Sequence, residues 1–377
     1  MKPLYFDYNA TTPVLPRVVE AMLPYLREHF GNPGSGHVWG FKAKQAVDRA
    51  RTQVAGLINC APGDLVFTSC ATESDNLALL GILAGQPGAH LVTTAIEHPA
   101  ILECAAYLES QGARVSRVGV DAQGVVDPEA VLAACDGGAE LISVMLANNE
   151  TGAIQPVAEI AARARERGIP VHTDAAQAVG KIPVDVAALG VDLLTIAGHK
   201  LYAPKGVGAL YVRRGLTLAP QTHGGGQERG LRSGTENVPH LVALGEACAL
   251  AGEDLAAEMA RQGELGRIIE EGLAGLSYDL RMHSAHTPRL PNTLSVGFRG
   301  LKAGDIISGL VGLDVGVSAG AACHGDTTTV SHVLAAMGVP REYAEGTIRI
   351  SWGRLTCVAD VHDFGRRLRS VLNDLTY

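Results

Sequence analysis

The stretch IPVHTDAAQAVGKIPVDVAALGVDLLTIAGHK, Ile169 to Lys200, decides the fold. Two short runs rich in apolar and β-branched residues, 169–175 and 191–199, lie on either side of a turn and a short helical pattern. Similar runs occur at 64–70, 90–95, 114–120, 140–147 and 207–214, and helical patterns such as 156–168 separate several of them. Strands that alternate with helices are typical of βαβ units. The sequence therefore predicts an α/β fold with a mostly parallel, seven-stranded sheet.

The length and the later part of the chain predict a second domain. The chain has 377 residues, and a domain commonly has about 100–200. A long helical pattern covers 241–276, and strand-like runs and a helical tail follow it. We expect a large cofactor-binding domain over 15–255 and a smaller α+β domain formed by 1–14 and 256–377.

The composition excludes several classes of protein. The formal net charge is -8 and no basic run is present, so a nucleic acid is not expected as partner, because binding one needs clustered Lys and Arg. Seven scattered cysteines suit a reducing cytoplasm better than a disulfide framework. The chain shows no signal peptide and no apolar run long enough to span a membrane. In that compartment the Asn-x-Thr patterns at Asn9 and Asn149 carry no glycosylation.

The nucleotide, hydrolase and metal motifs are missing. Neither a dinucleotide fingerprint, nor a phosphate loop, nor a Gly-x-Ser-x-Gly elbow occurs. No Cys-x-x-Cys pair is present, and adjacent residues such as Cys323 and His324 usually point their side chains apart. No metal site is predicted.

Two residues of the opening stretch indicate one particular cofactor. Asp174 and Lys200 end or follow predicted strands, and the carboxyl edge of a parallel sheet is where ligands bind. Pyridoxal phosphate needs a lysine that forms a Schiff base and a carboxylate that keeps the pyridine nitrogen protonated. On the residues alone, Asp174 can equally be a helix N-cap and Lys200 a solvated loop residue. The pair nevertheless makes pyridoxal phosphate the cofactor to test.

The start of another predicted helix suits the phosphate of that cofactor. The stretch VFTSCATESDNLALL, 66–80, predicts a strand, a turn at Ala71, Thr72 and Glu73, and a helix. Free N–H groups and the positive end of the dipole make a helix N-terminus a site for anions. Thr72 can also be a simple helix cap.

Nine motifs in order make the chain resemble one family. They cover nearly the whole chain and are YFDYNATTPV (5–14), GNPGSGHVWG (31–40), TSCATESDN (68–76), TTAIEHPAI (93–101), ANNETGAIQP (147–156), HTDAAQAVGKIPVDV (172–186), AGHKLYAPKGVGALYVR (197–213), GGGQERGLRSGTENVP (224–239) and IRISWGR (348–354). Together they resemble the cysteine desulfurases of the class V aminotransferase group. The resemblance implies the fold type I architecture of pyridoxal-phosphate enzymes and a homodimer with active sites at its interface.

The resemblance also implies a role for individual residues. Lys200 is the Schiff-base lysine, Asp174 the partner of the pyridine nitrogen, and His98 a ring that stacks on the cofactor and moves protons. Arg349 binds the substrate carboxylate. The remaining implied contacts are those of Asn149 and Gln177 with the ring oxygen and substrate, and those of Ala71, Thr72, His199 and, from a second subunit, Thr235 with the phosphate. Without the motifs, His98 reads as a core histidine and Asn149 as a turn residue.

The stretch GVSAGAACHGDTTTVS, 316–331, contains the cysteine that the resemblance makes the sulfur acceptor. In the family this cysteine attacks the sulfur of L-cysteine, which leaves L-alanine and a persulfide on Cys323. The resemblance implies that the persulfide sulfur then passes to an acceptor, which can be another protein. Small, polar neighbours suit a nucleophile that must move, and they suit an inert buried thiol badly.

Two positions depart from the family pattern. Ala197 stands where many members have a serine that binds the phosphate, so one donor is expected to be missing. Residues 319–324, AGAACH, are more similar to the selenocysteine lyases of the same group, which makes L-selenocysteine the alternative substrate. Two alternatives belong to other functional classes. One is an aminotransferase, which would not need Cys323, and the other is a non-catalytic scaffold protein.

Overall fold

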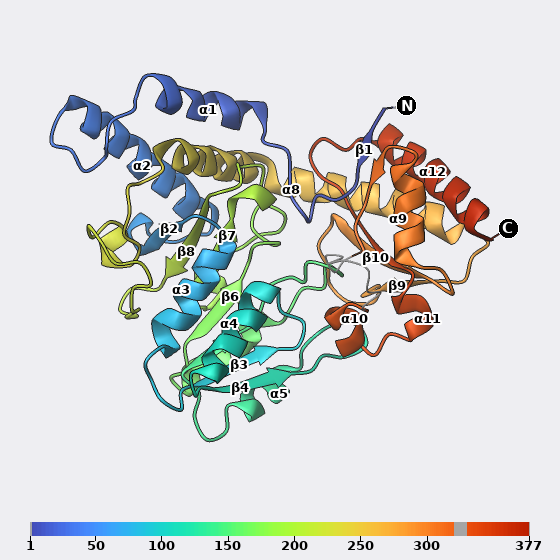
Figure 1. Ribbon diagram of the computed structural model, residues 1–377, viewed down its shortest axis with the longest axis horizontal. Coiled ribbons are helices and arrows are strands. Elements are labelled where there is room, and N and C mark those ends of the chain that lie inside the picture. The colour runs from blue at the N-terminus through green and yellow to red at the C-terminus, as the bar shows by residue number, and fades with distance from the viewer. Residues whose placement is uncertain (1, 320–329, 377) are drawn as a thin grey trace.

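The computed structural model describes residues 2–319 and 330–376 as two bodies joined by helix α8 (Val238–Ala274) (Figure 1). The larger body contains a seven-stranded sheet, and the smaller body contains most of the chain after α8. The chain starts in the smaller body, where β1 (Leu4–Tyr5) pairs in parallel with β11 (Val315–Gly316). None of the helices in the described ranges is long and apolar enough to cross a membrane.

The central sheet has the strand order β2-β8-β7-β6-β5-β3-β4. Its strands are β2 (Leu65–Thr68), β3 (His90–Thr94), β4 (Arg114–Val118), β5 (Leu141–Ser143), β6 (Val171–Asp174), β7 (Leu193–Ala197) and β8 (Gly208–Val212). All neighbours are parallel except the two pairs that involve β8, which is antiparallel to β2 and β7. The predicted mostly parallel sheet of seven strands is confirmed.

Helices cover both faces of this sheet. They are α1 (Pro16–Arg27), α2 (Val38–Leu57), α3 (Ala71–Leu83), α4 (Pro99–Ser110), α5 (Pro128–Ala134), α6 (Val157–Glu166) and α7 (Val186–Leu189), with 3-10 turns η1 (Pro62–Asp64), η2 (Gly198–Lys200) and η3 (Glu228–Gly230). Leu194 packs into the core shared with α2 and α6, whereas its neighbour Leu193 packs into the core shared with α3 and α4. Alternate strand residues point to opposite faces. A sheet covered on both sides therefore needs apolar residues at consecutive positions, as the sequence has them.

The smaller body has its own sheet and its own core. An antiparallel sheet has the order β12-β10-β9, and α9 (Ala303–Val311) and α12 (Val358–Thr376) pack beside it (Figure 1). The other elements are β9 (Leu280–His283), β10 (Thr293–Phe298), α10 (His332–Ala336), α11 (Arg341–Ala344) and β12 (Thr347–Ser351). Phe6, Phe298, Trp352 and Phe364 are among the largest side chains of this core, and all are buried.

Helix α8 is interrupted where the sequence predicts a domain boundary. Asp254 has non-helical angles of φ -140° and ψ 20°. Before this point Cys248 packs in the core of the larger body, and after it Leu265 packs in the core of the smaller body. We therefore propose that 15–255 and 1–14 with 256–377 are the two domains.

Candidate active site

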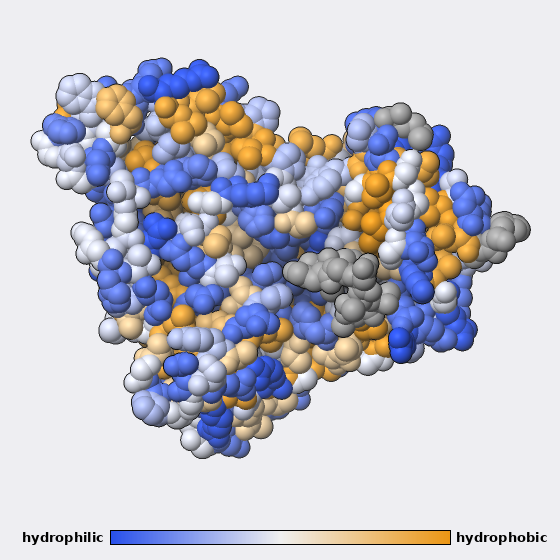
Figure 2. All heavy atoms as spheres, viewed as in Figure 1, coloured by the Kyte–Doolittle hydropathy of each residue, from blue (hydrophilic) through white to orange (hydrophobic). Residues whose placement is uncertain are grey.

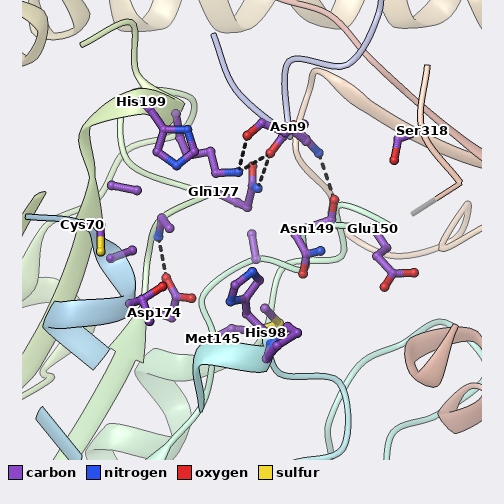
Figure 3. Close-up of a pocket in the computed structure, with 18 of the residues that line it drawn as sticks. Asn9, Cys70, His98, Met145, Asn149, Glu150, Asp174, Gln177, His199 and Ser318 are labelled. Atoms are coloured by element: carbon purple, nitrogen blue, oxygen red, sulfur yellow. Dashed lines mark hydrogen bonds between the residues drawn. The ribbon is translucent and has the colours of Figure 1, made fainter. Parts of the chain in front are cut away.

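Nine of the predicted site residues line one cavity of about 480 Å³, a size typical of small-molecule sites (Figure 3). They are Ala71, Thr72, His98, Asn149, Asp174, Gln177, His199, Lys200 and Arg349. Those from the larger body follow strands β2, β3, β5, β6 and β7, whose carboxyl ends lie at one edge of the sheet. The smaller body contributes Arg349 from β12.

Lys200 ends the 3-10 turn after β7. Its Nζ donates to the carbonyls of Asn9, at 2.6 Å, and Ala10, at 2.9 Å. Burial, with the positive charge of Arg349, lowers the pKa of Lys200 to about 8. An amine that is readily deprotonated near neutral pH is suited to attack an aldehyde.

The turn around Lys200 is tightly constrained. A Cβ atom on Gly198 would lie 2.8 Å from the side chain and the carbonyl of Val207, so only glycine fits there. Tyr202 has a φ of 71°, a strained value for this residue type, and its N–H donates to the hydroxyl of Thr12 at 2.8 Å. These contacts fix where the lysine side chain starts.

Asp174 is the last residue of β6 and is 6% exposed. One carboxylate oxygen accepts the N–H of Ala176 at 2.8 Å, as the N-cap interpretation expects. Burial raises the pKa of Asp174 despite this hydrogen bond and the nearby His98 and Lys200. A cation placed against this carboxylate would stabilise its charged form. The site is therefore suited to a protonated ring nitrogen.

A second buried carboxyl group lies behind Asp174. Asp75, on α3, is fully buried, and His172 Nε2 is 3.7 Å from its Oδ1. Burial and then the charge of Asp174 raise the pKa of Asp75 well above its usual value. Burial lowers the pKa of His172 to about 3, so this ring brings no positive charge to Asp75. Burial without a cationic partner favours the protonated form of Asp75.

His98 is the N-cap of α4, and its Nδ1 accepts the N–H of Ala100 at 3.1 Å. Burial lowers the pKa of His98 more than the charge of Asp174 raises it. The ring is therefore neutral, and because Nδ1 is an acceptor, the proton is on Nε2. The predicted stacking position has a defined tautomer.

The start of α3, where the sequence predicts the phosphate site, lines the cavity. Cys70 is the N-cap and makes no side-chain capping bond, so Thr72 is not the cap and lies inside the first turn. The carboxylate of Glu73 pairs with Arg232, 2.7 Å away, which neutralises the one acidic group of this turn. His199 contacts Thr11 Oγ1 through Nδ1 at 3.2 Å, and burial lowers its pKa to about 4.

Arg349 is 4% exposed and is held by two groups. Its Nη2 pairs with Asp7 at 2.7 Å, and its Nη1 donates to the carbonyl of Asn149 at 2.9 Å. Its Nε has no hydrogen-bond partner among the described residues. Each Nη has a second N–H, and a buried, fixed guanidinium with these spare donors is suited to bind a carboxylate.

Thr235 is the one described residue of the predicted set that does not line this cavity. Thr235 lies at a separate depression, beside Tyr25, Phe30 and Asn32. Cys323 lies outside the described residues. Ala197 does line the main cavity, so the position that lacks the family's serine is at the expected place.

Several cavity residues were not predicted from the sequence. They include Asn9, Ala10, Cys70, Met145, Glu150, Ser318 and His332. Asn9 showed only a glycosylation pattern, although it belongs to the motif YFDYNATTPV. It follows a strand of the smaller body, so the rule that ligands bind at the carboxyl edge of the large sheet could not find it.

The comparisons with known proteins agree with this geometry. Residues 4–364 match the family described as aminotransferase class-V. The cysteine desulfurase IscS of Neisseria meningitidis serogroup C is 44% identical over 378 residues, which cover 99% of this chain and 93% of that protein. A solved structure of a NifS-like protein superposes with a TM-score of 0.91 at 39% identity. The match covers 98% of this chain and 99% of the NifS-like chain.

A second solved structure, described as SspA in complex with cysteine, has a TM-score of 0.83 at 37% identity. The match covers 93% of this chain and 99% of the SspA chain. Family, relatives and solved structures thus agree over nearly the full length. The chain belongs to the cysteine desulfurases of the aminotransferase class-V family.

Proposed function

We propose that the protein binds pyridoxal phosphate and converts L-cysteine to L-alanine, with the sulfur passing to Cys323 as a persulfide. One observation carries this proposal. Lys200, with a pKa of about 8, and the buried carboxylate of Asp174 line the same cavity. Relatives named cysteine desulfurase share 43–44% of the sequence over nearly its full length.

The residues of the cavity fit this cofactor at both of its ends. Lys200 would hold its aldehyde carbon, Asp174 its ring nitrogen, and His98 one face of its ring. The N–H groups at Ala71 and Thr72, with His199, would hold the phosphate. When bound, pyridoxal phosphate supplies a ring that withdraws electrons from the α-carbon of the substrate.

The protein's own groups bind the substrate and move protons and sulfur. Arg349 binds the substrate carboxylate, and the Lys200 amine takes up and returns the α-proton. The Cys323 thiolate attacks the substrate sulfur. A sulfur–sulfur bond forms as the carbon–sulfur bond breaks, and its electron pair stays with the carbon skeleton, which leaves as alanine after protonation.

The active protein is a homodimer whose partner subunit supplies Thr235 to the phosphate. Two observations support this. Thr235 does not line the cavity of its own chain, and the strongly exposed Phe30 lies in the depression beside it. Figure 2 shows apolar side chains gathered over α1 at the upper left, and Leu26, Phe30, Trp39 and Phe41 are more than half exposed. The dimer works in the cytoplasm and passes its sulfur to an acceptor protein or a small thiol.

A selenocysteine lyase is the second candidate, because residues 319–324 resemble those enzymes. A selenol is a better leaving group than a thiol, so the two activities can differ without a difference in pocket size. Alanine release from L-cysteine and L-selenocysteine, measured side by side, separates them. A preference of several orders of magnitude for selenocysteine would replace the first candidate.

The test of the proposal is the variant Cys323→Ser. It should lose sulfide release from cysteine but keep the visible absorbance of the bound cofactor. Cys357→Ser is the matched control, since Cys357 is exposed and its thiol contacts Asp360, away from the cavity. Mass analysis after incubation with cysteine should find one added sulfur on the peptide that contains Cys323. Unchanged sulfide release in Cys323→Ser would refute the persulfide route.

A further inference from the structure

Asn9 connects the two bodies at the cavity. It is 1% exposed, and its side chain and backbone make polar contacts with both bodies. The contacts are to Asn149, Gln177, Lys181 and Lys200 in the larger body and to Asn292, Thr293 and Ser351 in the smaller body. A residue with this many buried contacts is held in one place. No role in the reaction was predicted for Asn9 from the sequence.

The carbonyl of Asn9 is aimed at the amine of Lys200. It accepts Lys200 Nζ at 2.6 Å and Gln177 Nε2 at 3.0 Å, and the carbonyl of Ala10 accepts the same Nζ at 2.9 Å (Figure 3). Two carbonyl oxygens on one ammonium group stabilise its charged form, because hydrogen bonds to a charged group are the stronger ones. They also hold a flexible four-carbon side chain in one direction.

A second buried lysine holds Asn9 from behind. Lys181 Nζ donates to Asn9 Oδ1 at 3.1 Å and to Gln177 Oε1 at 2.8 Å. Burial, then the charges of Lys200 and Arg349, lower the pKa of Lys181 well below its usual value. Burying a lysine beside two other cations costs folding free energy, and hydrogen bonds from its amine offset part of that cost. What those bonds fix is the Asn9 side chain and the amide of Gln177.

We propose that Asn9 is a positioning residue for Lys200. Its side chain, held by Lys181, keeps the carbonyls of Asn9 and Ala10 where they receive the free amine of Lys200. This role rests on the proposed function. Only a lysine that the substrate displaces, and that must later bond again to the same aldehyde carbon, needs its free amine held in one place. Between displacement and return, the two carbonyls keep the amine beside the reacting atoms.

The test measures the pKa of Lys200 in full-length protein freed of any bound aldehyde with hydroxylamine. Each lysine is labelled with acetic anhydride over a range of pH, and the Lys200 peptide is followed by mass analysis. The charged or titratable groups around this amine are Asp7, His98, Asp174, Lys181, His199 and Arg349. Asn9→Ala leaves all of them in place. Wild type should titrate at a pKa of about 8.

In Asn9→Ala the Lys200 pKa should fall by about one unit, because loosened carbonyls lose a hydrogen bond to a charged group. Asn9→Ser, whose hydroxyl cannot reach both Lys181 and Asn149, should give a smaller fall of the same sign. This second variant decides the matter should the alanine variant not fold.

Gln155→Ala is the matched control. Gln155 is 3% exposed and bonds the N–H of Val126 and the carbonyl of Gly124, with no recorded bond to Lys200 or Asn9. It should lower the melting temperature without changing the Lys200 pKa. An unchanged or raised Lys200 pKa in both Asn9 variants would overturn the positioning role. The labelling needs no cofactor. The proposed function is tested separately, by whether the wild type gains visible absorbance with pyridoxal phosphate, so the two proposals can fail independently.

Discussion

Replacing Arg349 by lysine should weaken substrate binding by an amount that the structure allows to be worked out. The guanidinium pairs with Asp7 through Nη2 and donates to the Asn149 carbonyl through Nη1, and each Nη keeps a second N–H for a ligand. A lysine ammonium is a compact point charge on a flexible stem. It can pair with Asp7 or with a substrate carboxylate, but it cannot reproduce the planar fork that serves both.

The loss is at least one hydrogen bond to a charged group, each worth about 1.5–3 kcal/mol. Since about 1.4 kcal/mol is a factor of ten, kcat/KM should fall about 10- to 160-fold. The carboxylate does not change during the reaction, so its contact with Arg349 is equally strong in the ground and transition states. Most of the fall should therefore appear as a higher KM with little change in kcat.

Arg367→Lys is a matched control. Arg367 is also about 5% exposed, donates to the carbonyls of Leu313 and Lys2 and pairs with Asp363, but it lies on α12. Its Nε, like that of Arg349, has no partner in the part of the chain that the structure describes. Both variants should melt at similarly lowered temperatures. Steady-state alanine release should separate them, because only Arg349→Lys raises KM. Equal kinetics in the two variants, or a fall confined to kcat, would show that Arg349 does not bind the substrate carboxylate.

Three further results are expected. The rate of pyridoxal phosphate uptake, measured by visible absorbance, should rise about tenfold for each unit by which pH increases up to pH 8, and then level off. The reason is that only the neutral amine of Lys200 reacts and its pKa is about 8. A rate independent of pH would contradict this. Burial raises the pKa of Glu97 from 4.5 to about 8, so the folded protein holds a proton that the unfolded chain releases, and stability should fall as pH rises between these values. Thermal melts of Glu97→Gln should lack that part of the slope, and an identical slope would argue against it. Gly353→Ala would place a Cβ 2.3 Å from the Tyr202 hydroxyl and 2.4 Å from the Tyr8 ring, so it should lose about 1–3 kcal/mol of stability in denaturant unfolding, and unchanged stability would contradict the packing.

Residues at the ends of the large strands could be predicted from the sequence. Asp174 and Lys200 follow recognisable apolar runs, and parallel strands bring their carboxyl ends to one edge whatever their spacing in the chain. The start of α3 is a local signal of the same kind. Nothing in the run 207–214 shows that β8 is antiparallel, because a strand buried on both faces has the same pattern in either direction.

Residues that reach the cavity from elsewhere could not be predicted from strand patterns. Asn9 arrives from the smaller body, and its place depends on the pairing of β1 with β11, more than 300 residues apart in the chain. His332 follows a segment with no strand or helix pattern. Arg349 was found only through the family resemblance, since an arginine within an apolar run otherwise reads as an edge-strand residue. Long-range packing decides these positions.

The pairing of β1 with β11 also sets the order in which a nascent chain can complete the cavity. Asn9 and Ala10 emerge first from the ribosome, but the N–H of Asn9 donates to the hydroxyl of Ser351, and Ser351 and Arg349 are both made late. A growing chain stopped near residue 255 has every strand of the large sheet and no finished pocket. The substrate-carboxylate contact that we propose for Arg349 therefore cannot form until translation is nearly over.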